Sequence, residues 1–475
     1  MSNKKKMLPS KSEEPAKWYT EVIRLAELAD YGPSRGTIIF RPYSYEIWER
    51  VQAAFDIMIK DYGVKNAYFP MFIPMSFLEK EKDHVEGFAP ELAVVTHGGG
   101  QELEEKLAIR PTSETIVNDS FSKWVQSYRD LPIKLNQWCS VVRWEKRTLP
   151  FMRTTEFLWQ EGHTVHRTHE EAIEMYEYAM DSYAQLYREY FALDGYVGKK
   201  STMERFAGAD DTLTYEMMMP SGKALQSCTS HDLGQNFAKA FETKFQDEDG
   251  EERYVWQTSW GLSTRSIGGL IVGHGDDNGL ILPPKIAPIQ AVIVPVKTDG
   301  PLVDYVNKVG ETLKSHGIRT EIDLRDDERF GFKLNKWEVR GVPLAIKVGD
   351  NEVESQTVTI RRRDNGEESG IVLTDINKVV DELLEKIQAD LLKKSTEIKE
   401  RETRTAQTYD EMKQILKEHK GFVKVYWNDN VDVEKKIKED TKAVSRCLLE
   451  ENAPEGKDFY TGESSTTVWL FAQAY

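Results

Sequence analysis

The residues best suited to chemistry on a phosphate lie in one segment of the chain. Arg143, Trp144 and Glu145 close an apolar run, and residues 153–161 follow as RTTEFLWQE. An arginine can hold a phosphate through two parallel hydrogen bonds. A carboxylate two positions along a strand shares its face, where it can accept a hydrogen bond from an adenine amino group. With Phe157 as a stacking surface, the segment predicts a nucleotide-binding strand-loop-strand or, alternatively, an exposed hairpin with surface ion pairs.

Two further segments carry a related signal. Residues 260–265 read WGLSTR and are soon followed by IGGLIVGHGDDNG, which is rich in small residues. Residues 41–74 read as a long helix that leads into a strand ending near Pro70. The sequence has neither a GxxxxGK[ST] phosphate loop nor a GxGxxG turn after a strand. A nucleotide would therefore be bound by another architecture.

In chain order, residues 41–74, 143–161 and 260–265 resemble motifs 1, 2 and 3 of the class II aminoacyl-tRNA synthetases. The resemblance implies that Arg143 and Arg265 are catalytic. The first would stabilise charge on the α-phosphate of ATP, and the second would hold the γ-phosphate and cover the adenine. It also implies a Mg²⁺ cofactor and a homodimer formed through motif 1. The residues implied in ATP binding are Arg143, Glu145, Arg153, Thr154, Phe157, Gln226, Thr229, Ser263 and Arg265.

Four segments are similar to those of the prolyl-tRNA synthetases: LAIRPTSET at 107–115, TTEFLWQEGHT at 154–164, HVEGFAPE at 84–91 and KALQSCTSHDLGQNF at 223–237. The C-terminal module and the terminal Tyr475 resemble the archaeal and eukaryote-like branch of that family. The large editing insertion of the bacterial branch is absent between motifs 2 and 3. The implied activity is proline–tRNA ligation, in which prolyl-adenylate forms first and tRNA(Pro) is then charged. The implied proline-binding residues are Thr112, Glu114, Arg143, Trp159, His163, His231 and Phe88.

Outside these motifs the same residues have plainer interpretations. Phe88 and Trp159 would be core aromatics, and His163 and His231 would be hydrogen-bonded structural histidines. Two functional alternatives also stay open. A threonyl-tRNA synthetase shares the domain plan, but the zinc-binding cysteine of that family would fall in the loop where Thr112 stands. A non-catalytic paralogue would usually lack one of the two motif arginines, and this chain has both.

The elements that must position these residues form several domains. Apolar spacing predicts helices within 15–60 and at 170–191, among short strands that suggest an antiparallel sheet. A proline-rich break follows near 281–288, and beyond it the alternation of AVIVPV, a helix and TEIDL indicates a βαβ-type unit. The expected fold class is α/β (α+β): a class II antiparallel sheet with helices, an α/β anticodon-binding domain and a small α+β module. The expected bounds are 1–14 for a flexible arm, 15–285 for the catalytic domain, 286–385 for the anticodon-binding domain, and 386–475 for a helical connector and C-terminal module.

One segment of the α/β domain is expected to read the anticodon. In the family that the chain resembles, the segment matching KWEVRGVPLAIKVG at 336–349 faces the anticodon. Glu338, Arg340 and Lys347 offer an acceptor and two donors for base edges there. The plainer alternative is a solvated junction between a helix and a strand.

The C-terminal module departs from the family pattern. Many members hold a structural zinc there with four cysteines, but Asn428, Val433, Asp458 and Thr461 stand at those positions. A tetrahedral structural site needs four Cys or His ligands, and Cys447 alone cannot form one. We therefore expect no structural zinc and a module held together by apolar packing of its tail.

Composition sets broader limits. The 475 residues, 40% of them hydrophobic, suffice for two or three domains. The formal net charge of −16 neither locates nor excludes a nucleic-acid surface, because an acidic chain can carry a local basic groove. The chain has no apolar run as long as a membrane span, and its three cysteines are far apart, which argues against a disulfide framework. The expected location is the cytoplasm, and the expected partners are tRNA(Pro), L-proline, ATP and a second copy of the chain.

Overall fold

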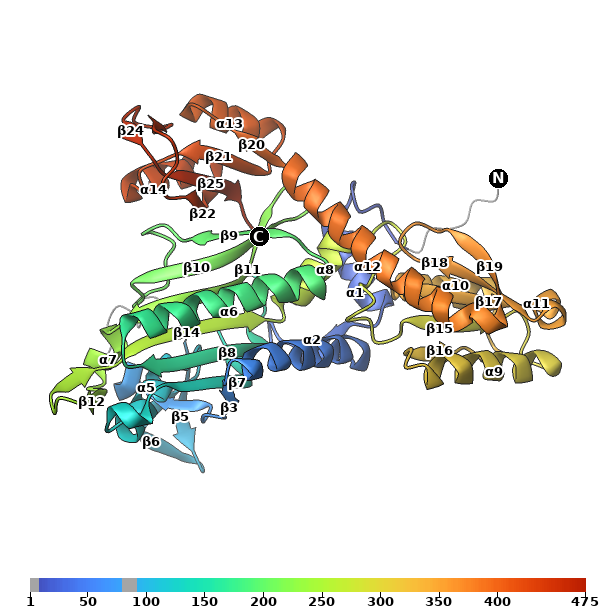
Figure 1. The fold of residues 1–475 in the computed structure, drawn as a ribbon, viewed down its shortest axis with the longest axis horizontal. Helices are drawn as coiled ribbons and strands as arrows, with labels where there is room; N and C mark the ends of the chain where they lie inside the picture. Colours follow the sequence, from blue (N-terminus) through green and yellow to red (C-terminus); the bar gives the residue numbers. More distant parts are fainter. Residues whose placement is uncertain (1–7, 79–91) are drawn as a thin grey trace.

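The structure is a computed structural model, in which residues 8–78 and 92–475 are described. It has three lobes linked by one long helix (Figure 1). We call residues 8–285 the core domain, residues 286–401 the α/β domain and residues 402–475 the C-terminal module. In the view of Figure 1 the α/β domain lies to the right, and the C-terminal module lies above the core domain.

The main sheet of the core domain is antiparallel except at one edge. Its described strands run in the order β9-β10-β11-β14-β8-β7-β3, and β3 pairs with β7 in parallel. The antiparallel sheet expected from the sequence is therefore confirmed. The strand bounds are β3 Lys65–Asn66, β7 Ile133–Val142, β8 Glu156–His166, β9 Gly195–Lys199, β10 Asp211–Met218, β11 Ala224–Gly234 and β14 Trp256–Ser263.

Helix α6 His169–Glu189 covers one face of this sheet, with α2 Pro42–Asp61 and α8 Arg265–His274 beside it (Figure 1). Helix α6 begins where the hydroxyl of Thr168 accepts a hydrogen bond from the backbone N–H of Glu171 at 3.3 Å, which satisfies one free N–H of its first turn. Its buried positions recur every three or four residues, the spacing of an amphipathic helix. They are Ala172, Met175, Tyr176, Ala179, Met180, Ser182, Tyr183, Leu186 and Tyr187.

The remaining elements of the core domain are shorter. Strands β4, β6 and β5 form a separate sheet in that order, and β1–β2 and β12–β13 form antiparallel pairs. The bounds are α1 Pro15–Leu25, β1 Ala29–Tyr31, β2 Ile38–Phe40, β4 Phe72–Pro74, α3 Met75–Leu78, β5 Ala93–Gly98, β6 Gln101–Ile109, α5 Glu114–Trp124, η2 Tyr128–Asp130, α7 Asn236–Ala240, β12 Lys244–Gln246 and β13 Glu252–Tyr254.

Residues 8–14 are anchored to the core domain. Leu8 is buried, and the Lys11 ammonium donates to the carbonyl oxygens of Val272 and Gly275 at 2.8 and 2.5 Å. These carbonyls lie at the end of α8, where helical partners are lacking. Within the arm predicted at 1–14, Lys11 thus caps the end of a helix.

The α/β domain contains the βαβ unit that the sequence predicts. Strands β15 Ala291–Pro295 and β16 Thr320–Ile322 are parallel and are linked through α9 Pro301–Ser315. All five residues of β15 are buried, as expected of a strand with both faces covered. The sheet order is β16-β15-β17-β18-β19. The other bounds are α10 Phe330–Val339, β17 Leu344–Val348, α11 Asp350–Ser355, β18 Thr357–Arg362, β19 Glu368–Val372 and η3 Leu373–Asp375.

Helix α12 Ile376–Arg401 crosses the domain boundary predicted at 385/386. Its first half packs into the core of the α/β domain through Ile376, Val380 and Leu384. Near its end, Ile398 joins a cluster that includes Phe422 of the C-terminal module. One amphipathic helix thus serves both units and spans the predicted boundary.

The C-terminal module extends the main sheet. Its strands continue that sheet in the order β20-β21-β25-β22-β9, giving eleven strands. Trp427, Trp469 and Phe471 pack in a core of their own, so the expected apolar packing of the tail is confirmed. The bounds are β20 Thr403–Thr405, α13 Tyr409–Glu418, β21 Phe422–Tyr426, α14 Val431–Thr441, β22 Ala443–Glu450, β23 Gly456–Lys457, β24 Ser464–Ser465 and β25 Val468–Gln473.

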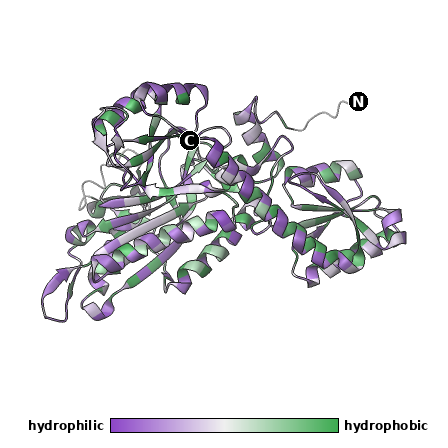
Figure 2. Ribbon diagram, turned by 45° about the horizontal axis from the view of Figure 1, so that its top comes forward, coloured by the Kyte–Doolittle hydropathy of each residue, from purple (hydrophilic) through white to green (hydrophobic). Residues whose placement is uncertain are grey.

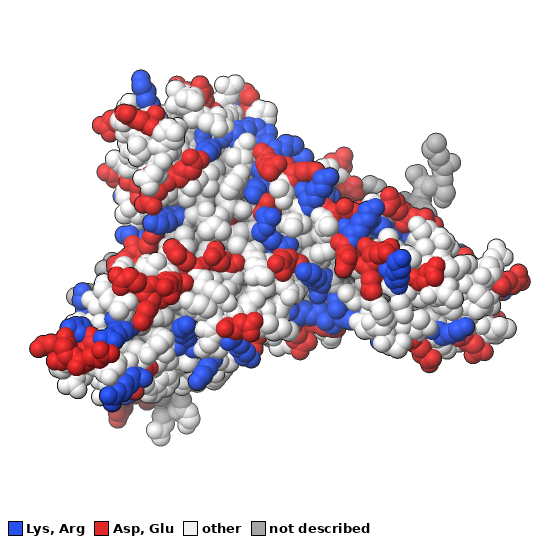
Figure 3. All heavy atoms as spheres, viewed as in Figure 1, with Lys and Arg blue, Asp and Glu red and all other residues white. Residues whose placement is uncertain are grey.

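Hydrophobic and hydrophilic residues alternate along the helices of all three lobes (Figure 2), consistent with amphipathic packing on the sheets. Acidic and basic side chains are mixed over the face shown in Figure 3, with an acidic cluster at the lower-left tip, where β12 lies in Figure 1. Within residues 8–78 and 92–475, none of the helices is both long enough and apolar enough to cross a bilayer.

Candidate active site

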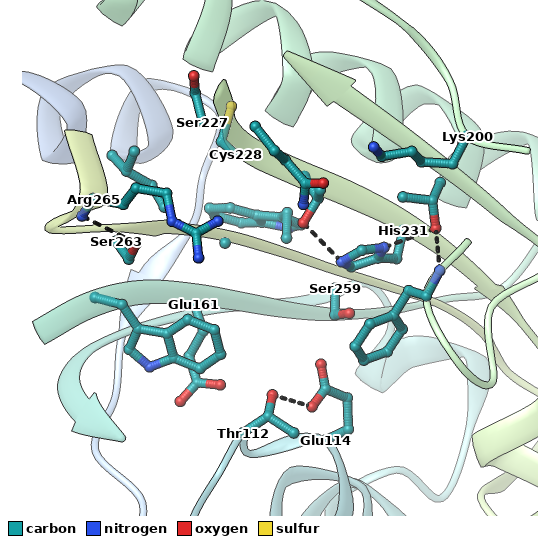
Figure 4. A pocket seen from close by; sticks show the side chains of 18 of the residues that line it. Thr112, Glu114, Glu161, Lys200, Ser227, Cys228, His231, Ser259, Ser263 and Arg265 are labelled. Carbon is teal, nitrogen blue, oxygen red and sulfur yellow. Dashed lines mark hydrogen bonds between the residues drawn. The ribbon is translucent and has the colours of Figure 1, made fainter. Parts of the chain in front are cut away.

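One cavity of about 220 Å³ lies on the main sheet and gathers most of the residues singled out from the sequence. Figure 4 shows Arg265 and Ser263 on one side of it, Lys200 and His231 on the other, and Glu114 below. The predicted site residues that line this cavity are Thr112, Glu114, Arg143, Phe157, Trp159, His163, Gln226, Thr229, His231, Ser263 and Arg265.

Strand pairing explains this grouping. Trp159 of β8 lies opposite Ser263 of β14, and His163 lies opposite Ser259. Because side chains alternate along a strand, residues two apart project from the same face of the sheet. A Cβ at Gly162 would lie 2.1 Å from the indole ring of Trp260, so a glycine is needed where this ring packs.

Arg143 follows β7 and reaches into the cavity over two aromatic rings. Its Nε donates to the carbonyl oxygen of Pro111 at 3.1 Å. Its guanidinium carbon lies 5.5 Å from the ring centroids of Phe157 and of Trp159, a distance at which the rings attract the cation. The side chain is therefore held in place before any ligand binds.

Arg265 begins α8 on the same side of the cavity. Its Nε donates to the carbonyl oxygen of Met152 at 3.1 Å. Burial and the positive charges of Arg143 and Arg153 lower the pKa of Arg265 to about 10. The guanidinium stays charged near neutral pH, and a polyanion between the arginines would relieve their repulsion.

Three residues predicted to bind ATP do not line the cavity: Glu145, Arg153 and Thr154. Arg153 Nε lies 3.2 Å from Glu145 Oε1, and the Thr154 hydroxyl donates to the carbonyl oxygen of Glu156 at 2.6 Å. The loop between β7 and β8 thus contains the surface ion pair of the plainer interpretation, while Arg143 and Phe157 of the same hairpin face the cavity.

Glu114 provides negative charge at the bottom of the cavity. It begins helix α5, where the helix dipole favours an anion. The hydroxyl of Thr112 donates to its Oε2, and both residues are almost fully buried, at 2% for Thr112 and 3% for Glu114. A buried carboxylate with an adjoining hydroxyl is suited to hold an ammonium group.

Glu161 and His163 form a buried pair beside Glu114. His163 Nε2 lies 3.2 Å from Glu161 Oε2, and Glu161 also accepts from the backbone N–H of Ser113 at 3.1 Å and from Gln137 Nε2 at 2.8 Å. Burial opposes the charge on Glu161, but His163 and these donors outweigh it and lower its pKa. Burial likewise opposes the charge on His163, but the bond to Glu161 and the nearby carboxylates outweigh it and raise its pKa. The pair therefore favours its charged forms.

His231 is fixed on both sides of its ring. Its Nδ1 lies 3.0 Å from the hydroxyl oxygen of Thr212, and its Nε2 lies 3.0 Å from that of Thr229. The ring also stacks on Phe206 with centroids 4.3 Å apart. The two rings together form a rigid wall of the cavity.

Sequence reasoning missed Glu161, Lys200 and Phe206, all of which line the cavity. Alternation along β8 could have found Glu161, because it lies two residues before His163. Lys200 and Phe206 lie in a segment without a motif, and their backbone hydrogen bonds to Thr212 of β10 bring them to the site. The predicted Phe88 lies outside the described residues.

Two of the three residues predicted to read the anticodon are paired within the α/β domain. Glu338 Oε1 accepts from Arg361 Nη2 at 3.4 Å. Lys347 Nζ lies 2.6 Å from Glu368 Oε2. The two residues thus lie on α10 and β17, close to the same β18–β19 side of the sheet.

Arg340, the third of these residues, faces the core domain. It forms an ion pair with Glu27, and its guanidinium carbon lies 5.5 Å from the ring centroid of Tyr43. The carbonyl oxygen of Arg340 accepts from the Tyr43 hydroxyl at 3.2 Å. These contacts make Arg340 a link between the two domains.

Asp458 occupies a position where a zinc ligand would stand in the family that the sequence resembles. Its Oδ1 accepts from the backbone N–H groups of Tyr460 and Thr461, both at 2.9 Å, and its Oδ2 accepts from that of Asn428 at 2.8 Å. One buried carboxylate thus joins the two segments that would share a metal. Among the described residues, we find no group of three or more His, Cys, Asp or Glu side chains placed to hold a metal ion.

Three family models match successive parts of the chain. The class II core domain of the tRNA synthetases for G, H, P, S and T matches residues 94–273. The anticodon-binding domain matches residues 290–389, and the C-terminal domain of prolyl-tRNA synthetase matches residues 409–475.

Relatives that match the whole chain carry a consistent name. A proline–tRNA ligase from Rubrobacter xylanophilus is 49% identical over 98% of both chains. A chloroplastic/mitochondrial proline–tRNA ligase from Arabidopsis thaliana is 47% identical over 98% of this chain and 88% of its own length. The crystal structure of prolyl-tRNA synthetase from Cryptosporidium parvum, in complex with halofuginone and AMPPNP, matches with a TM-score of 0.95 and 42% identity over 99% of both chains.

Proposed function

The chain belongs to the prolyl-tRNA synthetases of class II and is an ATP-dependent proline–tRNA ligase, and we propose which of its residues perform the reaction. The threonyl and non-catalytic alternatives fall away, because the full-length relatives are named proline–tRNA ligases. The observation that carries the proposal is one cavity lined by the buried carboxylate of Glu114 and by two neighbouring arginines, Arg143 and Arg265.

Proline is proposed to bind with its ammonium group against Glu114 and Thr112. The prolinium nitrogen carries two N–H donors and a positive charge, which match a buried carboxylate and a hydroxyl. Trp159 and the stacked rings of Phe206 and His231 would wall the apolar part of the ring. The Glu161–His163 pair lines the cavity beside them.

ATP is proposed to lie on the side of Arg143 and Arg265. Arg143 would hold the α-phosphate, Arg265 the γ-phosphate, and Phe157 the adenine face. The AMPPNP in the Cryptosporidium structure is an ATP analogue, which supports a nucleotide site in this fold. Further contacts are proposed for Gln226, Thr229 and Ser263, which line the cavity. We leave Glu145, Arg153 and Thr154 out of this set, because they do not line it.

The first step needs placement more than proton transfer. The proline carboxylate is already ionised near neutral pH, so its oxygen can attack the α-phosphorus directly. An oxygen–phosphorus bond forms, the bond from the α-phosphorus to the bridging oxygen breaks, and pyrophosphate leaves. Arg143 would stabilise the charge that develops on the α-phosphate, and Arg265 that on the leaving group. In the second step a terminal ribose hydroxyl of tRNA(Pro) attacks the prolyl carbonyl and releases AMP.

Mg²⁺ is proposed to enter with the nucleotide. This ion usually keeps water and phosphate ligands and needs few protein ligands, which fits a cavity whose described lining offers no metal-binding cluster. When bound, it would neutralise phosphate charge.

We further propose that Glu338 and Lys347 contact the anticodon, and that Arg340 links the α/β domain to the core domain.

A homodimer through α2 is proposed because Tyr45 and Ile57 of this helix are exposed, at 42% and 63%, and exposed apolar side chains favour an interface. The cytoplasm is the proposed location, although the Arabidopsis relative is named chloroplastic/mitochondrial.

Replacing Glu114 tests the proposed orientation of proline. Glu114→Gln keeps the shape of the side chain but removes the charge, which should raise the KM for proline by about 10- to 100-fold, the worth of a charge-assisted hydrogen bond. The KM for ATP should stay within about twofold of wild type. Exposed Glu102→Gln is the matched control. Equal effects on both KM values would reject this orientation.

A further inference from the structure

Three buried charged side chains meet where the C-terminal module joins the core domain. Lys200 Nζ donates to Glu216 Oε1 at 2.9 Å. Arg446 donates to Glu216 Oε2 through Nε at 2.9 Å and Nη2 at 2.7 Å. The side chains of Lys200, Glu216 and Arg446 are 1%, 0% and 5% exposed. We call these three residues the buried triad.

The backbone around the triad is adapted to this contact. Arg446 is the extra residue of a bulge between Ser445 and Cys447 in β22, and a bulge re-aims a side chain. A Cβ at Gly198 of β9 would lie 2.1 Å from the carbonyl oxygen of Leu448. A glycine at this position therefore permits β22 to lie against β9 and brings Arg446 to the triad.

The triad is connected to the wall of the proposed proline site. Lys200 itself lines the cavity, opposite Arg265 in Figure 4. Its backbone N–H donates to the carbonyl oxygen of Thr212 at 2.8 Å. The hydroxyl of Thr212 accepts from the backbone N–H of Phe206 at 3.2 Å and lies 3.0 Å from His231 Nδ1. Residues 200–206 and His231 thus form one hydrogen-bonded wall.

We propose that Arg446 is a positioning residue for amino-acid activation, through which the C-terminal module fixes Lys200 and the 200–206 wall of the proline site. The inference rests on the proposed placement of proline in this cavity. Arg446 lines no part of the cavity, so it acts through Glu216 and Lys200 without touching substrate.

The arrangement favours a role of Arg446 in positioning Lys200 over a role only in holding the C-terminal module on the core domain. A buried ion pair adds little net stability but strongly restricts geometry where its partners are fully hydrogen-bonded. Without Arg446, Glu216 keeps Lys200 and the Thr214 hydroxyl on Oε1, at 2.9 Å each, but loses both N–H donors to Oε2. Because Oε2 is then no longer fixed, the carboxylate can turn about Oε1 and shift Lys200 and the 200–206 wall. The wall is assigned to proline and is linked to the nucleotide side only through the Thr229–His231 contact, so its misplacement should affect proline more than ATP.

Pyrophosphate exchange on the full-length enzyme tests this role. Arg446→Met should raise the KM for proline by about tenfold while the KM for ATP stays within about twofold. Arg446→Lys, which keeps the charge but loses the two-point contact, should raise the KM for proline by about threefold. The matched control is Glu451→Gln, which breaks the exposed Lys199–Glu451 pair (3.6 Å) at the same seam and should change neither constant.

Folding is checked by circular dichroism and by the thermal midpoint of each variant. An Arg446→Met enzyme with a wild-type KM for proline, or with equal rises in both KM values, overturns the inference. If that variant does not fold, Arg446→Lys decides by the same criterion. The proposed function is tested separately by Glu114→Gln, so failure of one proposal leaves the other standing.

Discussion

Arg143 and Arg265 enter the same cavity from different elements, one from the end of β7 and the other from the start of α8. Each is held by a backbone carbonyl before a ligand arrives. Preorganised charge of this kind stabilises a transition state without reorganisation at the moment of reaction. The proposed roles of Arg143 and Arg265 in the chemical step rest on this preorganisation.

Arg143→Ala should lower proline-dependent pyrophosphate exchange by about 10²- to 10³-fold, because it removes charge stabilisation at the α-phosphate. The protein should still fold, since Arg143 lies at the cavity and outside the apolar core of the domain. Exchange would be compared with that of Arg129→Ala, an exposed arginine of the same domain. Activity within about tenfold of wild type would remove Arg143 from this role.

The Glu161–His163 pair predicts a pH-dependent stability. Burial opposes the charge on His163, but Glu161 and Glu114 outweigh it and raise its pKa. The folded-state pKa of His163 lies above the unfolded value of about 6.5. The stabilisation that charged His163 gives the folded state is therefore complete below pH ~6.5 and is lost as the pH rises through the folded-state pKa. The thermal midpoint of wild type should exceed that of His163→Gln by about 2–4 °C more at pH ~5.5 than at pH ~8.5. A difference that grows with pH would contradict this assignment.

For single residues, the sequence predicts the site well where the residues of a motif alternate along one strand and so share a face of the sheet. Trp159 and His163 are found because they lie in one quoted segment, and the same alternation contains Glu161. Phe206 could not be found, because its place depends on a hydrogen bond to Thr212 and a ring contact with His231. Glu145 and Arg153, both expected at the nucleotide, pair with each other across the β7–β8 loop, a contact that the motif alone does not predict.

Among the elements, the segment between β23 and β24 of the C-terminal module is held by hydrogen bonds to one carboxylate. Asp458 accepts three backbone N–H groups from two separate segments. In the family, four cysteines around zinc would join those segments. In a module predicted to lack structural zinc, the buried carboxylate of Asp458 would take the place of the metal, because it accepts hydrogen bonds from the backbone N–H groups of both segments.

Asp458→Ala should destabilise the module by about 2–3 kcal/mol, because three buried N–H groups lose a charged acceptor. Asp458→Asn, which keeps one carbonyl acceptor, should cost less. A chelator should not change the thermal midpoint of the wild type, and elemental analysis should find no stoichiometric zinc. Bound zinc, or unfolding of the module by the chelator, would show that the ligands lie elsewhere.

Long elements with a regular period are the ones that the sequence locates well. The helices expected at 170–191 and within 15–60 correspond to α6, α1 and α2. Short elements are located less well: β20 follows α12 within the segment expected as helical connector and C-terminal module, because a short edge strand is chosen by its partner β21 and not by its own residues. The apolar stripe of α12 continues past the boundary predicted at 385/386 and reaches the C-terminal module.

For the molecule as a whole, activation and tRNA reading are assigned to different domains. The cavity lies on the main sheet of the core domain, whereas Glu338 and Lys347 lie on α10 and β17 of the α/β domain. A change at the second site should therefore leave the first reaction untouched, unless it disturbs the junction held by Arg340 and Glu27.

Glu338→Ala should lower aminoacylation of tRNA(Pro) by about tenfold, the worth of one lost contact to a base edge, and leave proline-dependent pyrophosphate exchange within about twofold. Glu354→Ala, at an exposed position of α11 in the same domain, serves as the control. Equal loss in both assays would indicate a folding defect and would exclude an anticodon role for Glu338.

The most direct test of the account is ATP–pyrophosphate exchange by the purified protein with each amino acid in turn. We predict strong exchange with proline and weak but detectable exchange with alanine, because an apolar pocket discriminates against a smaller substrate by only about 1–3 kcal/mol per methylene. Threonine should give no exchange above background. Exchange that is stronger with threonine than with proline, or absent with proline, would contradict the proposed site and the reaction assigned to it.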